Sequence, residues 1–411
     1  MLIEIIIALL LGITAGTITG LIPGIHINLI AIILLSISTT LLKITSPLTL
    51  IIFITSMAIT HTFLDFIPSI FLGAPDEDSV LSILPGHQLL LKGRAYYAVV
   101  YTLYGSLASL LIILFFTPLF IYILPILYPY IQKIMWLILI FVSVYLISTE
   151  KQKNKILWAF FIFLLAGFLG IASLNMNIKE PLLPLLTGLF GASNLLISIK
   201  QKTKIPPQRT TKLTNIKISK KSIARASFAT VIASPFTAFL PGLGASQAAL
   251  IGKQFLGKKS DQRQFLFLLG AINTIVMGLS FIAIYSIQRT RTGAAVAINQ
   301  LIPNLTISIL SLVILTIFIS GISSFFIAIT ISKQIAKNIH KIQYSKLSII
   351  ILTILLIIIL LFSDFTFQGK LLSLLIFLTS STLGIFTILI GIKRMHLMGC
   401  LLLPTILFYI L

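Results

Sequence analysis

The sequence predicts an all-α polytopic membrane protein, and three observations support this fold class. Of the 411 residues, 58% are hydrophobic and only 9% are charged, and the mean hydropathy is +1.11. A water-soluble globule needs more polar surface than this composition supplies. Apolar runs of roughly 18 residues or more recur along the chain, and each is long enough to cross the hydrocarbon core as a helix. We therefore expect a multi-pass protein of the cell membrane.

The length rule predicts about ten to twelve transmembrane helices. Several apolar runs are too long or too interrupted to be single crossings, so the expected number is a range. The runs are 1–22, 25–42, 47–72, 96–118, 119–149, 156–174, 182–199, 223–252, 264–287, 294–332, 347–363, 371–391 and 395–411. These runs leave no segment long enough for a soluble domain.

The net charge of +21 comes from basic residues in short loops between the apolar runs. Nine of the 30 Lys and Arg residues lie between Lys200 and Arg225, without any acid among them. Such loops follow the positive-inside rule, which places them in the cytoplasm, next to the anionic headgroups of the lipid bilayer. No aromatic or Gly-rich pattern accompanies the basic residues, so we expect no nucleic-acid partner. Cys400 is the only cysteine, which excludes an intrachain disulfide.

The chain reads as two related halves, 1–199 and 223–411, joined by a basic cytoplasmic linker, 200–222. A Pro-Gly pair interrupts an apolar run in GLIPGIHINL of the first half and in AFLPGLGASQ of the second. AITHT (58–62) and AINT (271–274) follow at comparable distances. Two echoes in the same order suggest a duplication. The helix that leads to the second Pro-Gly pair follows a basic loop, which is expected to be cytoplasmic, whereas the helix that leads to the first pair starts at an N-terminus without Lys or Arg. The two halves are therefore predicted to be inverted in the membrane. The alternative is that each Pro-Gly pair occurs by chance.

A Pro-Gly pair inside a span predicts a broken helix, because proline lacks a backbone donor and glycine permits a sharp bend. The freed N–H and C=O groups must line a cavity, meet side chains or bind a solute. Helix N-termini at such breaks favour carboxylates. The alternative is that nearby side chains only satisfy the broken backbone. The candidate substrate-binding residues are Pro23, Gly24, His26, Asn28, Pro241, Gly242, Gly244, Ser246, Gln247 and Asn273, with Arg289 and Arg291 as possible partners of a carboxylate.

Acidic residues are scarce, and four of the nine fall between Asp65 and Asp78. His61 and Asp65 are four positions apart and therefore share one face of a helix. An ionisable pair in a membrane span suggests a proton relay or cation coordination. The alternative is a buried hydrogen bond that only joins two helices. Asp76, Glu77 and Asp78 begin a segment that continues to Pro85-Gly86, so we expect a re-entrant hairpin, with a solvated surface tip as the alternative. The candidate ion-coupling residues are His61, Asp65, Asp76, Glu77 and Asp78.

Five segments resemble the large membrane subunit of the tripartite tricarboxylate transporters, the TctA family, and most closely its archaeal branch. They are GLIPGIHINL, FIPSIFLGAPDEDSVLSILPGHQLLLKGRAYYAV, LLTGLFGASNLL, FLPGLGASQAAL and IKRMHLMGCLLLPTILFYIL. The resemblance implies a permease of about a dozen helices in two related halves. It also implies a small membrane subunit and an extracytoplasmic binding protein as partners. His26 stands where the first PGxG motif of the family has its second glycine.

The sequence thus predicts a secondary transporter, not an enzyme, that carries a small organic anion such as a carboxylate. Na⁺ or H⁺ would be the coupling ion, and no other cofactor or metal is expected. ATP-driven transport by this chain is not expected, because it has no P-loop. The alternatives are a membrane-embedded enzyme or flippase acting on a lipid-linked substrate, and a passive channel. A homo-oligomer is compatible with the sequence.

Overall fold

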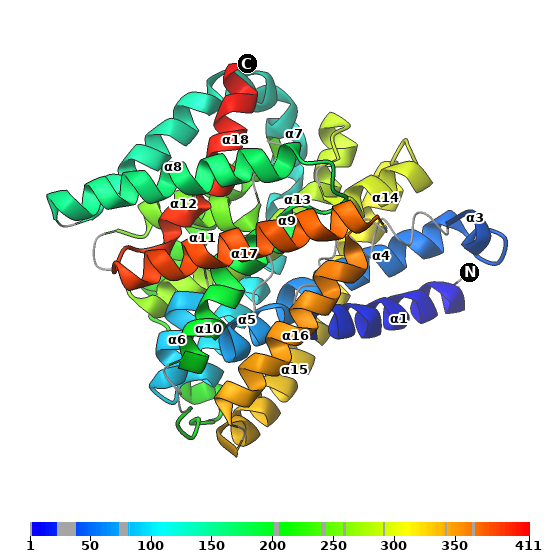
Figure 1. Cartoon of the computed structure of the whole chain (residues 1–411). Coiled ribbons are helices and arrows are strands. Elements are labelled where there is room, and N and C mark those ends of the chain that lie inside the picture. The colour runs from blue at the N-terminus through cyan, green and yellow to red at the C-terminus, as the bar shows by residue number, and fades with distance from the viewer. Residues whose placement is uncertain are drawn as a thin grey trace.

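The computed structural model describes residues 2–22, 38–73, 81, 83–150, 152–200, 205–239, 244–257, 260–290, 292–341, 343–363 and 366–411. These residues form helices connected by short turns, with no strand among them (Figure 1). The elements are α1 (Leu2–Leu21), α3 (Ser38–Leu41), α4 (Pro47–Leu64), α5 (Phe66–Leu72), α6 (Ile83–Leu91), α7 (Ala95–Ser148), α8 (Lys153–Asn175), α9 (Leu182–Leu186), the π-helix η2 (Thr187–Ala192), α10 (Ser193–Lys200), η3 (Leu213–Asn215), α11 (Lys220–Phe239), α12 (Ala245–Phe255), α13 (Gln262–Ile287), α14 (Gly293–Leu301), α15 (Ile307–Asn338), η4 (Ile339–Lys341), α16 (Tyr344–Phe362), α17 (Phe367–Leu389), η5 (Arg394–Met398) and α18 (Gly399–Ile410).

Nine helical spans in the described part of the chain are long and apolar enough to cross a membrane, and 394–410 forms a shorter apolar helix. This confirms the predicted all-α membrane fold. The spans differ sharply in burial. In Pro47–Leu72 and in Gln262–Ile287, 94% of the apolar segment is buried inside the protein, whereas the value is 28% for Leu2–Leu21 and for Ser345–Phe362. Pro47–Leu72 and Gln262–Ile287 therefore form the centre of the protein. Spans of low burial, such as Leu2–Leu21 and Ser345–Phe362, present apolar side chains outward to lipid.

Two pairs of helices approach each other closely and run parallel. Gly12, Gly16 and Gly20 of α1 face successive turns of α4, from Ser56 to Leu64. Gly105 of α7 lies against the backbone of Phe267, and Gly270 of α13 lies against that of Thr102. In α1 and α4 the contact positions rise together along the two helices. In α7 and α13, Thr102 and Gly105 lie against residues 267–271, and Gly278, farther along α13, meets Ile113, farther along α7. The helices of each pair therefore run in the same direction. Without hydrophobic attraction between helices in lipid, small residues that permit close packing hold such pairs together.

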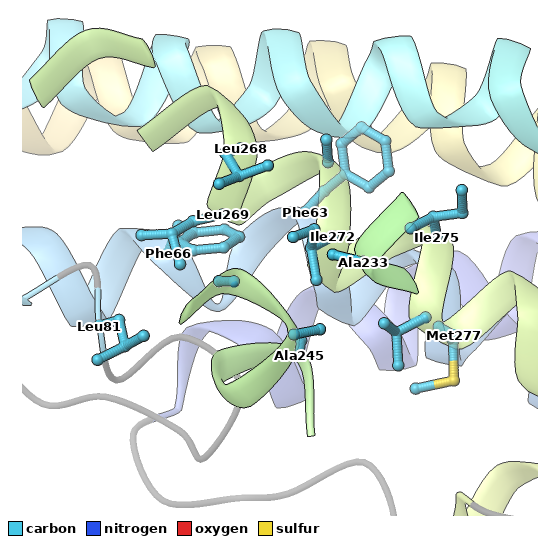
Figure 2. Packing of buried hydrophobic residues seen from close by; sticks show 14 of the residues in the cluster. Phe63, Phe66, Leu81, Ala233, Ala245, Leu268, Leu269, Ile272, Ile275 and Met277 are labelled. Atoms are coloured by element: carbon cyan, nitrogen blue, oxygen red, sulfur yellow. The ribbon is translucent and has the colours of Figure 1, made fainter. Parts of the chain in front are cut away.

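The central core is formed where α4, α5 and α13 meet. Phe63 of α4 and Phe66 of α5 are fully buried, and Leu269 and Ile272 of α13 belong to the same cluster. Figure 2 shows these side chains directed toward one another, with Ala245 at the start of α12 in the same cluster. This core fixes the position of the polar residues that α4 and α13 carry.

The predicted spans 96–118 and 119–149 form one helix, α7, of 54 residues. A straight helix of that length would measure roughly 81 Å, far more than the hydrocarbon thickness. The end of α7 lies against the C-terminal segment, because the Nζ of Lys393 donates to the carbonyl of Thr149 at 3.0 Å. Pro118, Pro125 and Pro129 lie inside α7, where each removes a backbone hydrogen bond and favours a kink. The two predicted crossings are therefore joined without a connecting loop.

The second Pro-Gly break has the predicted effect on its flanking helices. α11 ends at Phe239, before the break, and α12 begins at Ala245, after it. The Cβ position of Gly252 in α12 lies 3.4 Å from the Cβ of Ala233 in α11, so α12 folds back along α11. With 11 residues, α12 is too short to cross a membrane. In the first half, α1 ends at Leu21 and the break itself lies outside the described residues.

Both halves place a helix that precedes a Pro-Gly break beside a parallel helix. α1 runs parallel to α4. α11 runs parallel to α13, because Ser222 accepts from Gln264 near the start of both helices while Ala233 and Leu268 both lie at Gly252 farther along. This agreement is compatible with a duplication. The division into two related halves, and their inversion, remain predictions.

The C-terminal segment is fastened to the end of α7 by Glu150. Its carboxylate lies 3.0 Å from the Nε2 of buried His396 and 3.5 Å from the Nζ of Lys393. Burial raises the pKa of Glu150, but the hydrogen bond with His396 and the charge of Lys393 outweigh it and bring the pKa below its ordinary value. The folded protein therefore favours the charged form of Glu150.

The first prediction concerns the contact between α7 and α13. A Cβ added at Gly105 would lie 1.9 Å from the carbonyl oxygen of Phe267, which is backbone and cannot move aside. We expect Gly105→Ala to lower the free energy of unfolding by roughly 1–3 kcal/mol, measured by thermal unfolding in detergent. Gly321→Ala is the control, because its Cβ would meet only the flexible end of Leu110. Equal effects of the two substitutions would contradict the close packing of α7 on α13.

The second prediction concerns Glu150. Glu150→Gln removes the charge and should lower the free energy of unfolding by roughly 1–3 kcal/mol at neutral pH. A carboxyl whose pKa is lower in the folded protein stabilises it above the ordinary pKa, and this contribution disappears as the pH falls. The difference between wild type and variant should therefore narrow as the pH falls below the ordinary value of 4.5. Thermal unfolding between about pH 3 and pH 7 measures this difference in stability, with Glu4→Gln as the control. A difference that stays constant over this pH range would exclude a stabilising ion pair at Glu150.

Candidate functional site

A buried set of polar side chains lies where α1, α4 and α13 meet. We call it the central polar cluster, and it consists of Thr19, His61, Thr62, Asp65, Asn273 and Thr274. Its strongest link joins the two central spans. The Nδ2 of Asn273 donates to Oδ2 of Asp65 at 2.8 Å and lies 3.3 Å from the carbonyl oxygen of Thr62. Asp65 is 3% exposed and Asn273 is 2% exposed. Two residues singled out in the sequence, about 200 positions apart, are therefore in direct contact.

The other members extend this contact to both sides. His61 Nδ1 lies 3.2 Å from the hydroxyl oxygen of Thr19 in α1. The hydroxyl oxygens of Thr62 and Thr274 lie 3.3 Å apart. These two threonines end the echoed stretches AITHT and AINT, and a contact between equivalent residues is what a two-fold axis between the halves would produce. The cluster therefore joins α1 and α4 to α13.

Asp65 lies at the joint between α4 and α5. Its backbone N–H donates to the carbonyl oxygen of His61 at 3.0 Å, so the predicted helical relation of His61 and Asp65 is confirmed. Pro68 follows three residues later, lacks an N–H, and crowds the carbonyl of Leu64. α4 therefore ends at Asp65, and the carboxylate meets α13 there.

A carboxylate at this place requires compensation. Moving a charged carboxylate out of water costs far more than one neutral hydrogen bond returns. Asn273 offers an N–H, but an amide carries no charge. The cluster also holds hydroxyl and carbonyl oxygens, which are the ligands that hard cations such as Na⁺ prefer, while a proton would neutralise the carboxylate directly. The described residues contain no group of three or more His, Cys, Asp and Glu side chains suited to a transition metal.

The helix that follows the second Pro-Gly break begins near the central polar cluster. The carbonyl of Gly244 accepts from the N–H of Ala248, so Gly244 opens α12. Gly252 of α12 faces Leu268 and Ile272 of α13. Because α12 runs back along α11 and α13, its first turn, with fully buried Ser246, reaches roughly the depth of Asn273 at 1.5 Å per residue. A helix N-terminus at this depth directs the positive end of its dipole toward an anion.

The structure tests only some of the predicted site residues. His61, Asp65 and Asn273 come together, and Gly244 and Ser246 open α12 nearby. Gln247 belongs to α12, and its side chain is not among those described. The remaining candidates in the breaks and the acidic hairpin lie outside the described residues: Pro23, Gly24, His26, Asn28, Asp76, Glu77, Asp78, Pro241, Gly242 and Arg291.

Arg289 lies at a different level from this cluster. It follows the end of α13, is exposed, and its guanidinium lies 5.7 Å from the ring centroid of Tyr128. Sixteen residues separate Arg289 from Asn273, which corresponds to roughly 24 Å along a helix. The structure therefore does not bring Arg289 to the central polar cluster.

Sequence reasoning missed several buried polar residues. Arg394 is 9% exposed and donates through one Nη to the carbonyl oxygens of Leu189 and Phe190 and, at 3.1 Å, to the hydroxyl of Ser193. These carbonyls belong to the π-helix η2, whose widened turn leaves them open to a donor. The scarcity of acids could have drawn attention to Glu150. Nothing in the sequence pattern predicts that Thr19 meets His61.

Comparison with known proteins identifies the family of this chain. Residues 6–399 match the profile of the tripartite tricarboxylate transporter TctA family. The chain is 31% identical over 408 residues to uncharacterized protein MJ1079 of Methanocaldococcus jannaschii, with 98% of each chain covered. No solved structure matches the chain. The matched range includes both Pro-Gly breaks and the central polar cluster, and the chain belongs to the tripartite tricarboxylate transporter TctA family.

Proposed function

We propose that this protein is a secondary transporter that moves a small organic anion, a carboxylate, together with Na⁺ or H⁺. Family membership implies a component of a tripartite transporter, which works with partner subunits and a binding protein. The observation that carries the finer proposal is the buried carboxylate of Asp65, held by Asn273 between the two most buried spans.

The coupling ion would bind at the central polar cluster. A cation or a proton that neutralises Asp65 removes the main electrostatic cost of the cluster. His61 lies one helical turn from Asp65, and its ring would add a polar contact to the site. The neighbouring N-terminus of α12 would hold the carboxylate of the substrate, because the positive end of its helix dipole favours an anion. A coupling ion beside an anionic substrate explains how the two could bind together.

The partners in this proposal follow from the family. A small membrane subunit and an extracytoplasmic binding protein would deliver the anion to the face of the protein opposite the basic linker. A homo-oligomer remains a possibility that the proposal does not require.

The third prediction tests the coupling role of Asp65. If Na⁺ binds beside Asp65, it stabilises the protein by roughly 2.7 kcal/mol at a hundredfold excess over its dissociation constant. Wild-type protein should therefore melt a few degrees higher in NaCl than in choline chloride of equal ionic strength. The difference should disappear in Asp65→Asn. Asp261→Asn is the matched control, since it makes the same chemical change at an exposed helix cap, where Asn serves equally well.

Transport measurements complete this test. Proteoliposomes are given radiolabelled citrate, succinate or acetate with an inward Na⁺ or H⁺ gradient. Accumulation should depend on one gradient, and Asp65→Asn should abolish it while Asp261→Asn retains it. If H⁺ is the coupling ion, the Na⁺-dependent melting shift is absent and only the H⁺ gradient drives uptake. Gradient-driven accumulation at the wild-type rate in Asp65→Asn would overturn the proposed coupling role.

The fourth prediction concerns Asn273. Asn273→Leu removes the amide that donates to Asp65 at 2.8 Å. The loss of a hydrogen bond to a charged group should lower the free energy of unfolding by roughly 1–3 kcal/mol, and gradient-driven uptake should fall with it. Ser286→Ala on the same helix is the control, because its hydroxyl bonds the carbonyl of Ile282. Unchanged stability and uptake in Asn273→Leu would show that the contact has no role.

A further inference from the structure

A basic pocket lies where residues 205–219 of the linker cross the starts of α7 and α13. The cavity has a volume of about 290 Å³. Four of its eight lining residues are positively charged and none is acidic. The lining residues are Leu89, Arg94, Tyr97, Tyr101, Arg209, Asn215, Lys217 and Arg263, and we call this cavity the linker pocket. It lies outside the central polar cluster and shares no residue with it.

The four cations come from three separate parts of the chain. Arg94 immediately precedes α7, and Arg263 lies in the first turn of α13. Arg209 and Lys217 belong to the linker. Because α7 and α13 run parallel, both helices direct their N-termini, the positive ends of their dipoles, toward this side of the protein. Helix dipoles and side-chain charges therefore act with the same sign in the linker pocket.

Hydrogen bonds hold the linker in place, so the backbone that carries Arg209 and Lys217 has a fixed position. The side chain of Gln208 donates to the carbonyls of Leu90 at 3.0 Å and Pro206 at 2.7 Å and accepts from the N–H of Ala95 at 2.9 Å. The N–H of Arg209 donates to the carbonyl of Gly93 at 2.8 Å. Gly93 itself turns with a φ of 71°. The linker thus closes over the turn between α6 and α7.

Tyr104 fastens the far end of the linker, where its hydroxyl donates to the carbonyl of Leu213 at 3.1 Å. The pocket cations have little compensation from acids. Oδ2 of Asp261 lies 3.8 Å from Nε of Arg263, but both side chains are more than half exposed, and such pairs contribute little. Like charges gathered on a fixed frame repel one another, and an anion in the linker pocket would relieve this repulsion.

We propose that the linker pocket binds a phosphate group on the cytoplasmic side of the membrane. Arginine forks and a lysine that approach from different directions suit a tetrahedral group with oxygens on every side, whereas one arginine already satisfies a planar carboxylate. The tyrosine hydroxyls add neutral donors. The pocket has room for more than the phosphate itself, so the group belongs either to an anionic phospholipid headgroup or to a soluble phosphate compound.

The linker pocket is separate from the proposed transport site. Along α13, Arg263 precedes Asn273 by ten residues, or roughly 15 Å. The positive-inside rule places the linker in the cytoplasm. α15 runs antiparallel to α7, since Gly321 meets Leu110 while Phe325 stacks on Tyr104, so the basic C-terminal end of α15 lies on this same side. The ligand would therefore come from the cytoplasm or from the inner leaflet.

The fifth prediction tests this site with two probes on purified full-length protein. Thermal unfolding is followed in sodium phosphate and in sodium chloride of equal ionic strength. Native mass spectrometry in phosphatidylglycerol and in phosphatidylcholine counts the lipids that stay bound. A specific rise in melting temperature with phosphate identifies a soluble ligand, and selective retention of phosphatidylglycerol identifies a lipid headgroup. Either result supports the phosphate site, and the absence of both overturns it.

Variants assign the signal to the linker pocket. Arg209→Gln and Lys217→Gln alter exposed side chains of the linker. Each should weaken the affinity for the ligand that gave the positive result, phosphate or phosphatidylglycerol, roughly tenfold, as expected for the loss of one charge-assisted contact. Arg225→Gln removes the same charge from an exposed position on α11 outside the pocket and should change little. Equal weakening by Arg225→Gln would show a general charge effect and overturn the proposal. Since none of these residues belongs to the central polar cluster, Na⁺-dependent stabilisation should persist in all three.

Discussion

The structure depends on one constraint, which is that polar groups inside hydrocarbon must find their partners within the protein. No water is present there to bond a free N–H, C=O or carboxylate. The chain meets this constraint most clearly in the two spans that are 94% buried, where polar side chains of α4 and α13 satisfy each other. Asp65 and Asn273 are the clearest case. The helices that face lipid carry mainly apolar side chains, and many of their serines and threonines bond back to their own turns, as Ser311 and Thr379 do.

Close helix packing is a consequence of the same constraint. A side-chain hydrogen bond between two helices forms only when their backbones lie at the separation that the two side chains can span. Gly105 and Gly270 permit backbone contact between α7 and α13, and Gly12, Gly16 and Gly20 do so between α1 and α4. The short contact of Thr19 with His61 lies beside the last of these glycines. The glycines therefore set the distances on which the central polar cluster depends.

The fold class, the effect of the second Pro-Gly break and the helical relation of His61 and Asp65 could be predicted from the sequence, because each follows from local rules of length, proline chemistry and helical spacing. The partner of Asp65 could not, since that contact depends on how two spans about 200 residues apart cross. The continuity of α7 through its prolines also escaped prediction, because a proline can bend a helix as well as end it. Arg394 and the linker pocket depend on tertiary contacts of segments with no local signal.

The charges along α13 give a physical reason for coupling in the proposed transport. Arg263 lies at its start, Asp65 is bound near its middle, and Arg289 follows its other end. Positive charge at both ends attracts an anion from either side of the membrane. The carboxylate in the middle repels the same anion, strongly so because the surroundings there have a low dielectric constant. The anion could pass this level only when a cation or a proton has neutralised Asp65, so an arrangement of three charges would make movement of the anion depend on the coupling ion.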